Sequence, residues 1–397
     1  MKPQKLLCVF LTVIILICPL TVNATDYQMP INDDALYTSA DASVEGNEFD
    51  CKSVILMEAN TGKIIYTQNA NEALPPASVT KVMTLLLVME AIDAGKIKLD
   101  DMVSVSERAA SMGGSQIFLE VGEQMSVEDM LKSVIIASAN DAACALAEFC
   151  EGSETAFVEK MNSRASELGM KNTHFENTNG LDDTAQNHVT SARDIAIMSR
   201  ELIKHKKILE YSSIWMDTVR GGAFGLTNTN RLVRYYQGCT GLKTGSTDKA
   251  GFCISATAER GGVSLICVVM GAPTRDIRNN IATTLFDRGF AKYEMYSSKG
   301  DTIENIKMLG SKDRYARLEY HQFTYLANKG TSSKITKNIV LNDNICAPLS
   351  KGDVVGKVEY MLDGKKIGSV DVTVCEDVER IEYYTLIFRA FSRFFLK

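Results

Sequence analysis

Histidine is scarce in this chain, which contains only four among its 397 residues. His174 and His188 lie in the middle of the sequence, and neither has a second ligand at the spacing that a metal site requires. We therefore interpret both as structural residues. Cys-x-x-Cys pairs are also absent. The sequence consequently predicts neither a bound metal nor a cofactor.

A hydrophobic run of bilayer length is lacking at the N-terminus. The apolar run over residues 6–20 has about 15 residues, whereas a transmembrane helix needs roughly 20. Lys2 and Lys5 precede this run, and a small-x-small cleavage pattern follows it at residues 22–24. We predict a signal peptide over residues 1–24, and hence export, with a retained membrane span as the alternative.

A surplus of positive charge is missing too. Loss of the leader removes Lys2 and Lys5 and leaves 41 basic against 49 acidic residues, a net charge of −8. Because the phosphates of nucleic acids require a basic surface, the composition argues against a nucleic-acid partner.

The eight cysteines that follow the leader allow two interpretations. An even number in an exported chain is compatible with disulfide bonds. Most of them, however, lie within apolar runs such as residues 265–268. This position favours buried free thiols.

The order of strand and helix patterns predicts one mixed α/β domain. A hairpin is predicted over residues 53–68, and strand-like runs follow much later, at residues 251–257 and 263–270. Between them, residues 98–235 have a mostly helical pattern, which includes a run over residues 127–149. Strands from both ends therefore flank a helical middle, and the sheet is completed late in the sequence.

Changes in pattern divide the exported chain into four parts. Residues 25–50 are polar and acidic, which predicts a flexible lead-in. The mixed α/β domain covers residues 51–295. Residues 300–376 alternate short strands with Gly, Asp and Lys turns, so we predict a small β domain there. The remaining tail covers residues 378–397.

This tail has one apolar and one basic face when it is placed on a helix. It is too short to span a bilayer, but it can lie in the membrane interface with its cations toward the headgroups. Packing onto the β domain is the alternative. The apolar face contains Tyr384, Ile387, Phe388, Phe391, Phe394 and Phe395, and the basic face contains Arg389, Arg393 and Lys397.

Ser78 and Lys81 form a Ser-x-x-Lys motif at the start of a predicted buried helix over residues 78–94. Residues three apart on a helix share a face, so the Lys81 amine can reach the Ser78 hydroxyl. A serine needs a base to become a nucleophile. Burial, together with a nearby cation such as Lys243, would lower the pKa of Lys81 toward that role.

The same pattern occurs a second time, at Ser246 and Lys249. That match follows a glycine turn, is polar throughout, and has no apolar helix after it. We therefore assign it no catalytic role.

Two further motifs complete a set for covalent acyl transfer. Ser138 and Asn140 form a Ser-x-Asn element, in which the hydroxyl can pass a proton to a leaving group and the amide can hold the substrate or Lys81. Lys243-Thr244-Gly245 follows at a predicted strand edge. Its cation and hydroxyl suit a carboxylate, and its glycine allows close approach of a substrate strand.

Two main-chain groups are predicted to stabilise an oxyanion. Ser78 would lie at a helix N-terminus, where amides are unpaired, so its own N–H can donate to developing negative charge. The N–H of Ser246, just beyond Gly245, is the natural second donor.

These three motifs together resemble the signature elements of the penicillin-recognising serine transferases. The wider match, from about residue 53 to the C-terminus, is to the low-molecular-mass serine-type D-alanyl-D-alanine carboxypeptidases, and it includes residues 179–182, 190–194 and 251–253. The resemblance implies a β-lactamase/transpeptidase-like domain, an antiparallel sheet flanked by a helical region, and then a small all-β domain. It also implies a tail that anchors the enzyme peripherally on the outer face of the cytoplasmic membrane.

The resemblance also implies roles for single residues. Ser78 would be acylated by peptidoglycan stem peptides and trapped by β-lactams, with Lys81 as the base. Lys243 and Thr244 would contact the substrate carboxylate, assisted by Arg278, whose alternative is a surface helix arginine. Family members often carry a bulkier residue at the position of Ser246, so the chain departs from the family pattern at the substrate edge.

Three other functions remain open from the sequence. A β-lactamase of class A needs a second base, and no Glu-x-x-x-Asn segment follows Asn140 in the expected place. A D,D-endopeptidase would have the same fold. A non-catalytic penicillin sensor would not need to keep Ser78, Lys81, Ser138 and Lys243 together. We therefore predict hydrolysis of the terminal D-Ala from stem pentapeptides.

Overall fold

The computed structural model describes residues 44–45, 48–182, 185–313 and 315–395. The predicted signal peptide over residues 1–24 lies outside the described residues, and so does most of the predicted lead-in. Within the described part, there are two sheets of five or more strands: the larger one has a hydrophobic core on each of its faces, and the smaller one contributes to a third core.

The central sheet contains β1 (Val44–Glu45), β2 (Ser53–Glu58), β3 (Ile64–Gln68), β8 (Cys239–Thr247), β9 (Gly251–Arg260) and β10 (Val263–Ala272). Its strand order is β1-β3-β2-β10-β9-β8, and every neighbouring pair is antiparallel except β1 with β3. The early hairpin thus pairs with strands from late in the sequence, through β2 and β10. This confirms the predicted mixed α/β arrangement.

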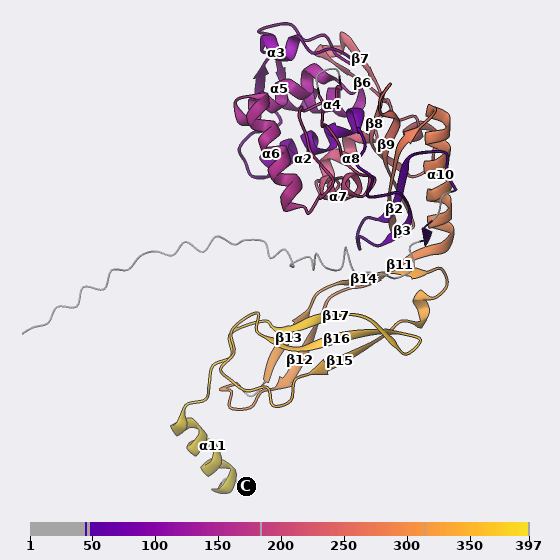
Figure 1. The fold of residues 1–397 in the computed structure, drawn as a ribbon. Helices are drawn as coiled ribbons and strands as arrows, with labels where there is room; N and C mark the ends of the chain where they lie inside the picture. Colours follow the sequence, from indigo (N-terminus) through magenta and orange to yellow (C-terminus); the bar gives the residue numbers. More distant parts are fainter. Residues whose placement is uncertain (1–43, 46–47, 183–184, 314, 396–397) are drawn as a thin grey trace, which may run out of the picture. The chain divides into compact units, whose positions relative to one another are not determined.

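Helices cover both faces of this sheet (Figure 1). On one face lie α2 and α7, and on the other lies α10. Shorter strand pairs are β4 (Met102–Ser104) with β5 (Gln124–Ser126), and β6 (Met216–Val219) with β7 (Phe224–Thr227). The helices are α2 (Lys81–Asp93), α3 (Glu107–Ala110), α4 (Val127–Ile136), α5 (Asn140–Glu151), α6 (Glu154–Glu167), α7 (Ala192–Leu202), α8 (Lys206–Ser212), α9 (Leu232–Tyr235) and α10 (Arg275–Lys292).

Alternate residues of β2 enter two different cores. Ile55 and Met57 belong to the core shared with α2, α4, α5 and α7, whereas Val54 and Leu56 belong to the core shared with α10. Side chains of a strand point alternately to its two faces, so a strand covered on both sides is apolar throughout. Helix α2 is likewise buried along almost its whole length, as a helix that is hydrophobic all round must be.

The predicted helical run over residues 127–149 is interrupted in the structure. Helix α4 ends at Ile136 and α5 begins at Asn140. Ser138 has a φ of +66°, in the left-handed region, and a helix cannot continue through it. The expectation of one continuous helix was therefore wrong at the Ser-x-Asn element, because apolar periodicity does not report a single residue that changes backbone region.

A second sheet contains β12 (Asp301–Lys307), β13 (Tyr315–Tyr320), β15 (Thr336–Leu341), β16 (Val354–Leu362) and β17 (Lys365–Val374). Its order is β12-β13-β17-β16-β15, with antiparallel neighbours throughout. Leu318, Val358, Tyr360, Val372 and Val374 form the centre of its core. The strands β11 (Tyr293–Ser298) and β14 (Phe323–Asn328) form a separate pair.

The last described element is α11 (Tyr383–Phe395). Tyr384, Ile387 and Phe388 lie on it and are all exposed. Among the residues that the structure describes, no helix has both the length and the apolar character needed to cross a membrane.

Each of the eight cysteines from Cys51 to Cys375 is a free thiol. Cys144, Cys253 and Cys267 are buried within the hydrophobic cores. Burial disfavours the charged thiolate and raises the pKa of all three.

Candidate active site

Ser78 and Lys81 meet at the start of the buried helix α2. Ser78 lies in a short 3₁₀ turn, η1 (Ala77–Thr80), and Lys81 is the first residue of α2. Lys81 Nζ is 2.9 Å from Ser78 Oγ, within hydrogen-bonding distance. The same Nζ donates to the main-chain oxygen of Asn179 at 2.8 Å. Nucleophile and amine are therefore in direct contact before any substrate binds.

The surroundings of Lys81 favour its neutral form. The side chain is fully buried, and this desolvation is the main reason that its pKa lies well below the usual value. The positive charge of Lys243 lowers the pKa further, whereas Asp141 acts in the opposite direction. A neutral amine can accept the proton of a serine hydroxyl, so burial and Lys243 prepare Lys81 to act as a base.

The turn that carries Ser78 is held from the other side by His188. The Nδ1 atom of His188 accepts from the Glu176 amide at 2.9 Å, so its Nε2 carries the proton and donates to Thr80 Oγ1 at 2.7 Å. Thr80 Oγ1 in turn donates to the Ala77 oxygen. Burial lowers the pKa of His188 to about 4. His188 is thus placed as a neutral support, in agreement with its structural interpretation.

Gly180 fits closely against the same turn. Its φ is +83°, and a Cβ at this position would lie only 1.8 Å from the main-chain oxygen of Ala77. No other residue type can occupy such a contact without moving the backbone. This explains the glycine in the segment over residues 179–182.

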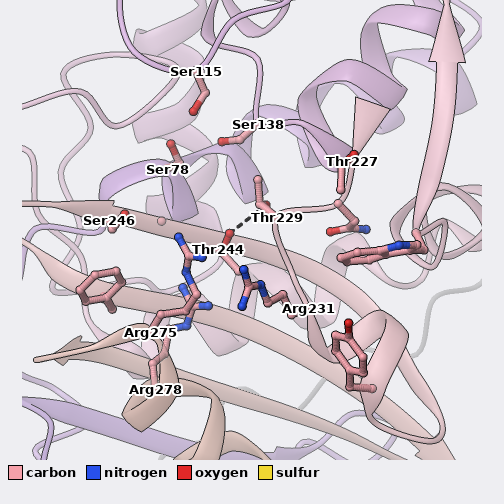
Figure 2. A pocket seen from close by; sticks show the side chains of 15 residues that line it. Ser78, Ser115, Ser138, Thr227, Thr229, Arg231, Thr244, Ser246, Arg275 and Arg278 are labelled. Carbon is pink, nitrogen blue, oxygen red and sulfur yellow. Dashed lines mark hydrogen bonds between the residues drawn. The ribbon is translucent and has the colours of Figure 1, made fainter. Parts of the chain in front are cut away.

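Ser138 and Asn140 come from the break between α4 and α5. The left-handed backbone of Ser138 turns its side chain toward Ser78, as Figure 2 shows. Asn140 is buried, its Nδ2 donates to the Gly113 oxygen at 2.7 Å, and its Oδ1 has no hydrogen-bond partner among the described residues. Ser138 lines the cavity beside Ser78, whereas Asn140 is not among the residues that line it.

The Lys-Thr-Gly motif lies on β8, the last strand of the central sheet as described, so the outer edge of β8 has no strand partner there. A Cβ at Gly245 would lie 2.7 Å from the main-chain nitrogen of Ser78. The glycine therefore allows β8 to approach the turn that carries the nucleophile. Thr244 Oγ1 donates to Thr229 Oγ1 at 2.8 Å. Ser246 is exposed and lies in the same cavity.

Lys243 is fully buried beneath the strand and does not line the cavity. Its Nζ donates to the Thr244 oxygen at 2.9 Å. Burial, followed by the charge of Arg278, lowers its pKa to about 7. The sequence predicts Lys243 as a contact for the substrate carboxylate. In the structure, Thr244 and Arg278 line the cavity and Lys243 does not.

Arg278 lines the cavity, together with Arg231 and Arg275. It lies in α10 with only 2 % of its surface exposed, and its guanidinium donates to Asn279 Oδ1 and to the Cys253 oxygen. Burial and the charge of Arg275 lower its pKa to about 10. The alternative of a surface arginine was wrong, because Arg278 lies on the face of α10 that packs against β9 and β10, whereas its neighbours Arg275 and Asp276 are exposed.

One cavity of about 640 Å³ brings most of the predicted residues together (Figure 2). This volume lies within the range of small-molecule binding sites. Its predicted members are Ser78, Ser138, Thr244, Gly245, Ser246 and Arg278, and its remaining members are Ser115, Trp215, Thr227, Asn228, Thr229, Arg231, Tyr235, Phe252 and Arg275.

Comparison with known proteins decides the family of the chain. The sequence profile of the family described as D-alanyl-D-alanine carboxypeptidase matches residues 39–274. The chain belongs to this family. A second profile, described as the C-terminal domain of penicillin-binding protein 5, matches residues 290–380. The chain is therefore a serine-type carboxypeptidase of the penicillin-binding class.

Individual carboxypeptidases and penicillin-binding proteins support this assignment. The D-alanyl-D-alanine carboxypeptidase DacF of Bacillus subtilis is 44% identical over 347 residues, which cover 86% of this chain and 89% of the relative. The crystal structure of penicillin-binding protein 5 from Haemophilus influenzae is similar with a TM-score of 0.72 at 34% identity, covering 84% of this chain and 99% of that one. Penicillin-binding protein D2 of Listeria monocytogenes, in its cefotaxime-bound form, has a TM-score of 0.57 at 34% identity and covers 62% and 99%.

Several cavity residues of this carboxypeptidase carry no sequence signal. Thr229, Arg231 and Tyr235 come from the segment between β7 and β8, and Arg275 begins α10. None of them belongs to a motif, and only tertiary structure brings them to Ser78. Asp141 is a further omission: it is buried and accepts from the amides of Ile117 and Leu119, which fixes the loop that carries Ser115. An acidic residue directly after the Ser-x-Asn element was the available signal.

Among the described residues, no three His, Cys, Asp or Glu side chains come together as a metal site requires. The second Ser-x-x-Lys match also forms no pair. Ser246 lies on β8 and Lys249 lies in the following turn, and both are exposed.

Proposed function

We propose that this carboxypeptidase removes the terminal D-Ala from peptidoglycan stem pentapeptides through an acyl-enzyme on Ser78. The observation that carries the proposal is the 2.9 Å contact between Lys81 Nζ and Ser78 Oγ in a fully buried setting. Neutral Lys81 takes the hydroxyl proton as Ser78 Oγ bonds to the penultimate carbonyl carbon. The amide bond then breaks, and a proton passes through Ser138 to the departing D-Ala nitrogen. Water later releases the shortened peptide.

Two main-chain amides supply the oxyanion site in this mechanism. Because Gly245 allows β8 to lie against the turn of Ser78, the N–H groups of Ser78 and Ser246 flank the same space. Fixed donors of this kind stabilise the charge that develops on a carbonyl oxygen. Ser246 acts here through its main-chain N–H, so the small size of its side chain does not weaken its role as an oxyanion donor.

The terminal carboxylate is recognised at Thr244 and Arg278. Both line the cavity, whereas Lys243 contributes positive potential from beneath the strand. A guanidinium and a hydroxyl can bind one carboxylate together. Asn140 Oδ1, which is buried and has no hydrogen-bond partner among the described residues, is an acceptor for the Lys81 ammonium after proton transfer or for a substrate amide that enters with a small side-chain shift.

A β-lactamase is disfavoured by the lining of the cavity. Class A enzymes of that kind use a glutamate to activate the water that removes the acyl group. None of the described residues that line this cavity is acidic. A long-lived acyl-enzyme with β-lactams is therefore expected.

Mass spectrometry after penicillin treatment tests the proposal, together with an assay of D-Ala release from a stem pentapeptide. We expect a stable adduct on Ser78 and steady release of D-Ala. Rapid loss of the adduct with destruction of the drug would identify a β-lactamase. Absence of both adduct and release would identify a non-catalytic protein.

We further propose that the protein acts on the outer face of the cytoplasmic membrane. The leader over residues 1–24 supports export. In α11, the exposed side chains of Tyr384, Ile387 and Phe388 support attachment to the membrane interface, where aromatic and aliphatic groups insert at the level of the headgroups. Arg389 lies on the same helix and donates to the Lys312 main-chain oxygen.

Truncation after Asp377 tests the attachment. The signal-cleaved truncated protein should leave the membrane fraction and retain full activity on a soluble peptide. Phe388→Glu should weaken binding to anionic vesicles, whereas Thr385→Glu, which adds the same charge to the helix without removing an aromatic ring, should weaken it less. Equal binding by the truncated and full proteins would contradict the proposal.

A further inference from the structure

The residues along β8 define the direction in which a bound peptide runs. Gly245 lies against the Ser78 turn, and Ser246 follows it, so the reacting carbonyl belongs at this point. Thr244 precedes it, lines the cavity, and marks the place of the terminal carboxylate. The acyl half of the peptide therefore extends beyond Ser246, and the leaving residue lies over Thr244.

The cavity does not end at Thr244. Thr244 is hydrogen-bonded to Thr229, and the lining continues through Arg231 to Trp215 and Tyr235. In the view of Figure 2, Thr244 and Thr229 lie between Ser78 and Thr227. A single D-alanine whose carboxylate is held at Thr244 would leave this part of the cavity unfilled.

The far part of the cavity has a stable aromatic wall. The rings of Trp215 and Tyr235 meet edge to face, with centroids 6.4 Å apart. Arg234 lies over both rings, at 5.4 and 5.5 Å from their centroids, and is not part of the cavity lining. Such a wall suits the methylene chain of a long side chain.

Arg231 adds a positive charge to this wall. Its guanidinium has no ion pair or hydrogen bond to another side chain among the described residues, and no acidic residue of the described lining neutralises it. Figure 2 shows it extending into the space beside Thr244. An unpaired guanidinium that faces a cavity is a binding group for a ligand carboxylate.

We propose that Trp215, Tyr235 and Arg231 form a leaving-group subsite for a D-amino acid whose long side chain ends in a carboxylate. The inference rests on the acyl-enzyme function proposed above. The bond that breaks is still the D-alanyl amide, and the leaving nitrogen still receives its proton through Ser138. The enzyme accordingly accepts amide bonds between D-Ala and a larger acidic residue, as well as the terminal D-Ala.

Three peptides with the same acyl half test the subsite. They carry diacetyl-L-lysyl-D-alanine followed by D-Ala, D-norleucine or D-2-aminoadipate, and the last two side chains are nearly equal in length. We expect a higher kcat/KM for the aminoadipate than for the norleucine peptide. In Arg231→Gln this preference should fall by about tenfold, the effect of losing a charge-assisted hydrogen bond. Trp215→Ala should lower kcat/KM for both long leaving groups relative to D-Ala.

A charge-matched control separates the subsite from general electrostatic attraction. Lys249→Gln removes one positive charge from the exposed turn between β8 and β9, outside the cavity lining. It should keep the preference for aminoadipate. Retention of the preference in Arg231→Gln, its absence in the wild-type enzyme, or an equal loss in Lys249→Gln would each overturn the inference.

Binding without turnover separates this inference from the proposed function. Trp215 is the single tryptophan of the chain, so its fluorescence reports occupancy of this wall. In Ser78→Ala, D-2-aminoadipate should change the fluorescence at lower concentration than D-norleucine does. Release of D-Ala without this difference overturns the subsite alone. The difference without any D-Ala release overturns the hydrolytic function and leaves the subsite standing.

Discussion

The chain contains the Ser-x-x-Lys pattern twice, and the two copies behave differently. At Ser78 the pattern begins on a 3₁₀ turn and enters a helix, so the amine of Lys81 lies against the hydroxyl. At Ser246 the pattern begins on a strand and ends in a turn. Residues three apart in a strand point to opposite faces. The serine and lysine of the Ser-x-x-Lys motif thus come into contact only where the backbone is helical.

Burial separates the two copies as clearly as backbone geometry does. Lys81 is fully enclosed and its pKa is depressed, whereas Lys249 is exposed. The difference shows that this motif depends on the helix that follows it, because that helix carries the lysine into the core.

Substitution of each serine by alanine in turn should give the largest difference in activity between the two copies. Ser78→Ala removes the nucleophile and should lower D-Ala release by more than about 10³-fold, as loss of an essential nucleophile does in other enzymes. Ser246→Ala keeps its main-chain N–H and should cost less than about tenfold. Parallel assays of release and of penicillin labelling measure both. Labelling of Ser78→Ala at another residue would refute the comparison.

Substitution of each lysine by methionine in turn should give the next largest difference, in the rate of acylation by penicillin. Lys81→Met retains the buried methylene chain and removes the base, so acylation by penicillin should fall by more than about 10²-fold. Lys249→Met should label at the wild-type rate. Circular dichroism of both variants checks that they fold. Normal labelling of Lys81→Met would remove Lys81 from the mechanism.

The contact of His188 with the turn that carries Ser78 should appear in the pH dependence of the free energy of unfolding. His188 has a folded pKa of about 4 and an unfolded pKa near 6.5. Between these values the unfolded chain binds a proton that the folded chain does not, so stability falls as the pH falls, by up to about 3 kcal/mol. His188→Gln should flatten this dependence, and His174→Gln, at an exposed position, should not. Urea unfolding followed by Trp215 fluorescence at several pH values measures it.

The smallest effect should be a shift of one limb of the pH profile. Activity rises as Lys81 loses its proton and falls as Lys243 loses its own, near its pKa of about 7. Because the charge of Arg278 lowers that pKa, Arg278→Gln should move the alkaline limb of kcat/KM upward, by less than about one pH unit. The position of the limb is independent of the overall loss of rate. A downward shift would contradict the assignment of Lys243.

Sequence patterns were sufficient where the chemistry is local. The hairpin of β2 and β3 and the strands β9 and β10 follow from apolar runs bounded by turns. The mixed α/β class follows from the order of strand and helix patterns, the carboxypeptidase family is implied by the resemblance that the three motifs carry, and both are confirmed. The interruption at Ser138 was missed because one residue with positive φ leaves the apolar periodicity unchanged.

The cavity beyond the motifs could not be read from the sequence. Thr229, Arg231 and Tyr235 line the same cavity as Ser78 only because β8, which follows them in the chain, joins a sheet that begins almost two hundred residues earlier. The burial of Lys243 behind Thr244, and of Arg278 against the sheet, was equally hidden. Side-chain burial depends on which elements pack together, and no short pattern records that.

The sequence by itself determined which groups are present: a serine, a lysine three residues later, a second serine with its asparagine, and a cationic motif on a strand. Tertiary structure decided their chemical state. It brought Lys81 Nζ to 2.9 Å from Ser78 Oγ, lowered the pKa of Lys81 by burial, and buried Lys243 outside the cavity lining. The physical reason is that proton affinity and reach depend on desolvation and distance, which only the folded chain establishes.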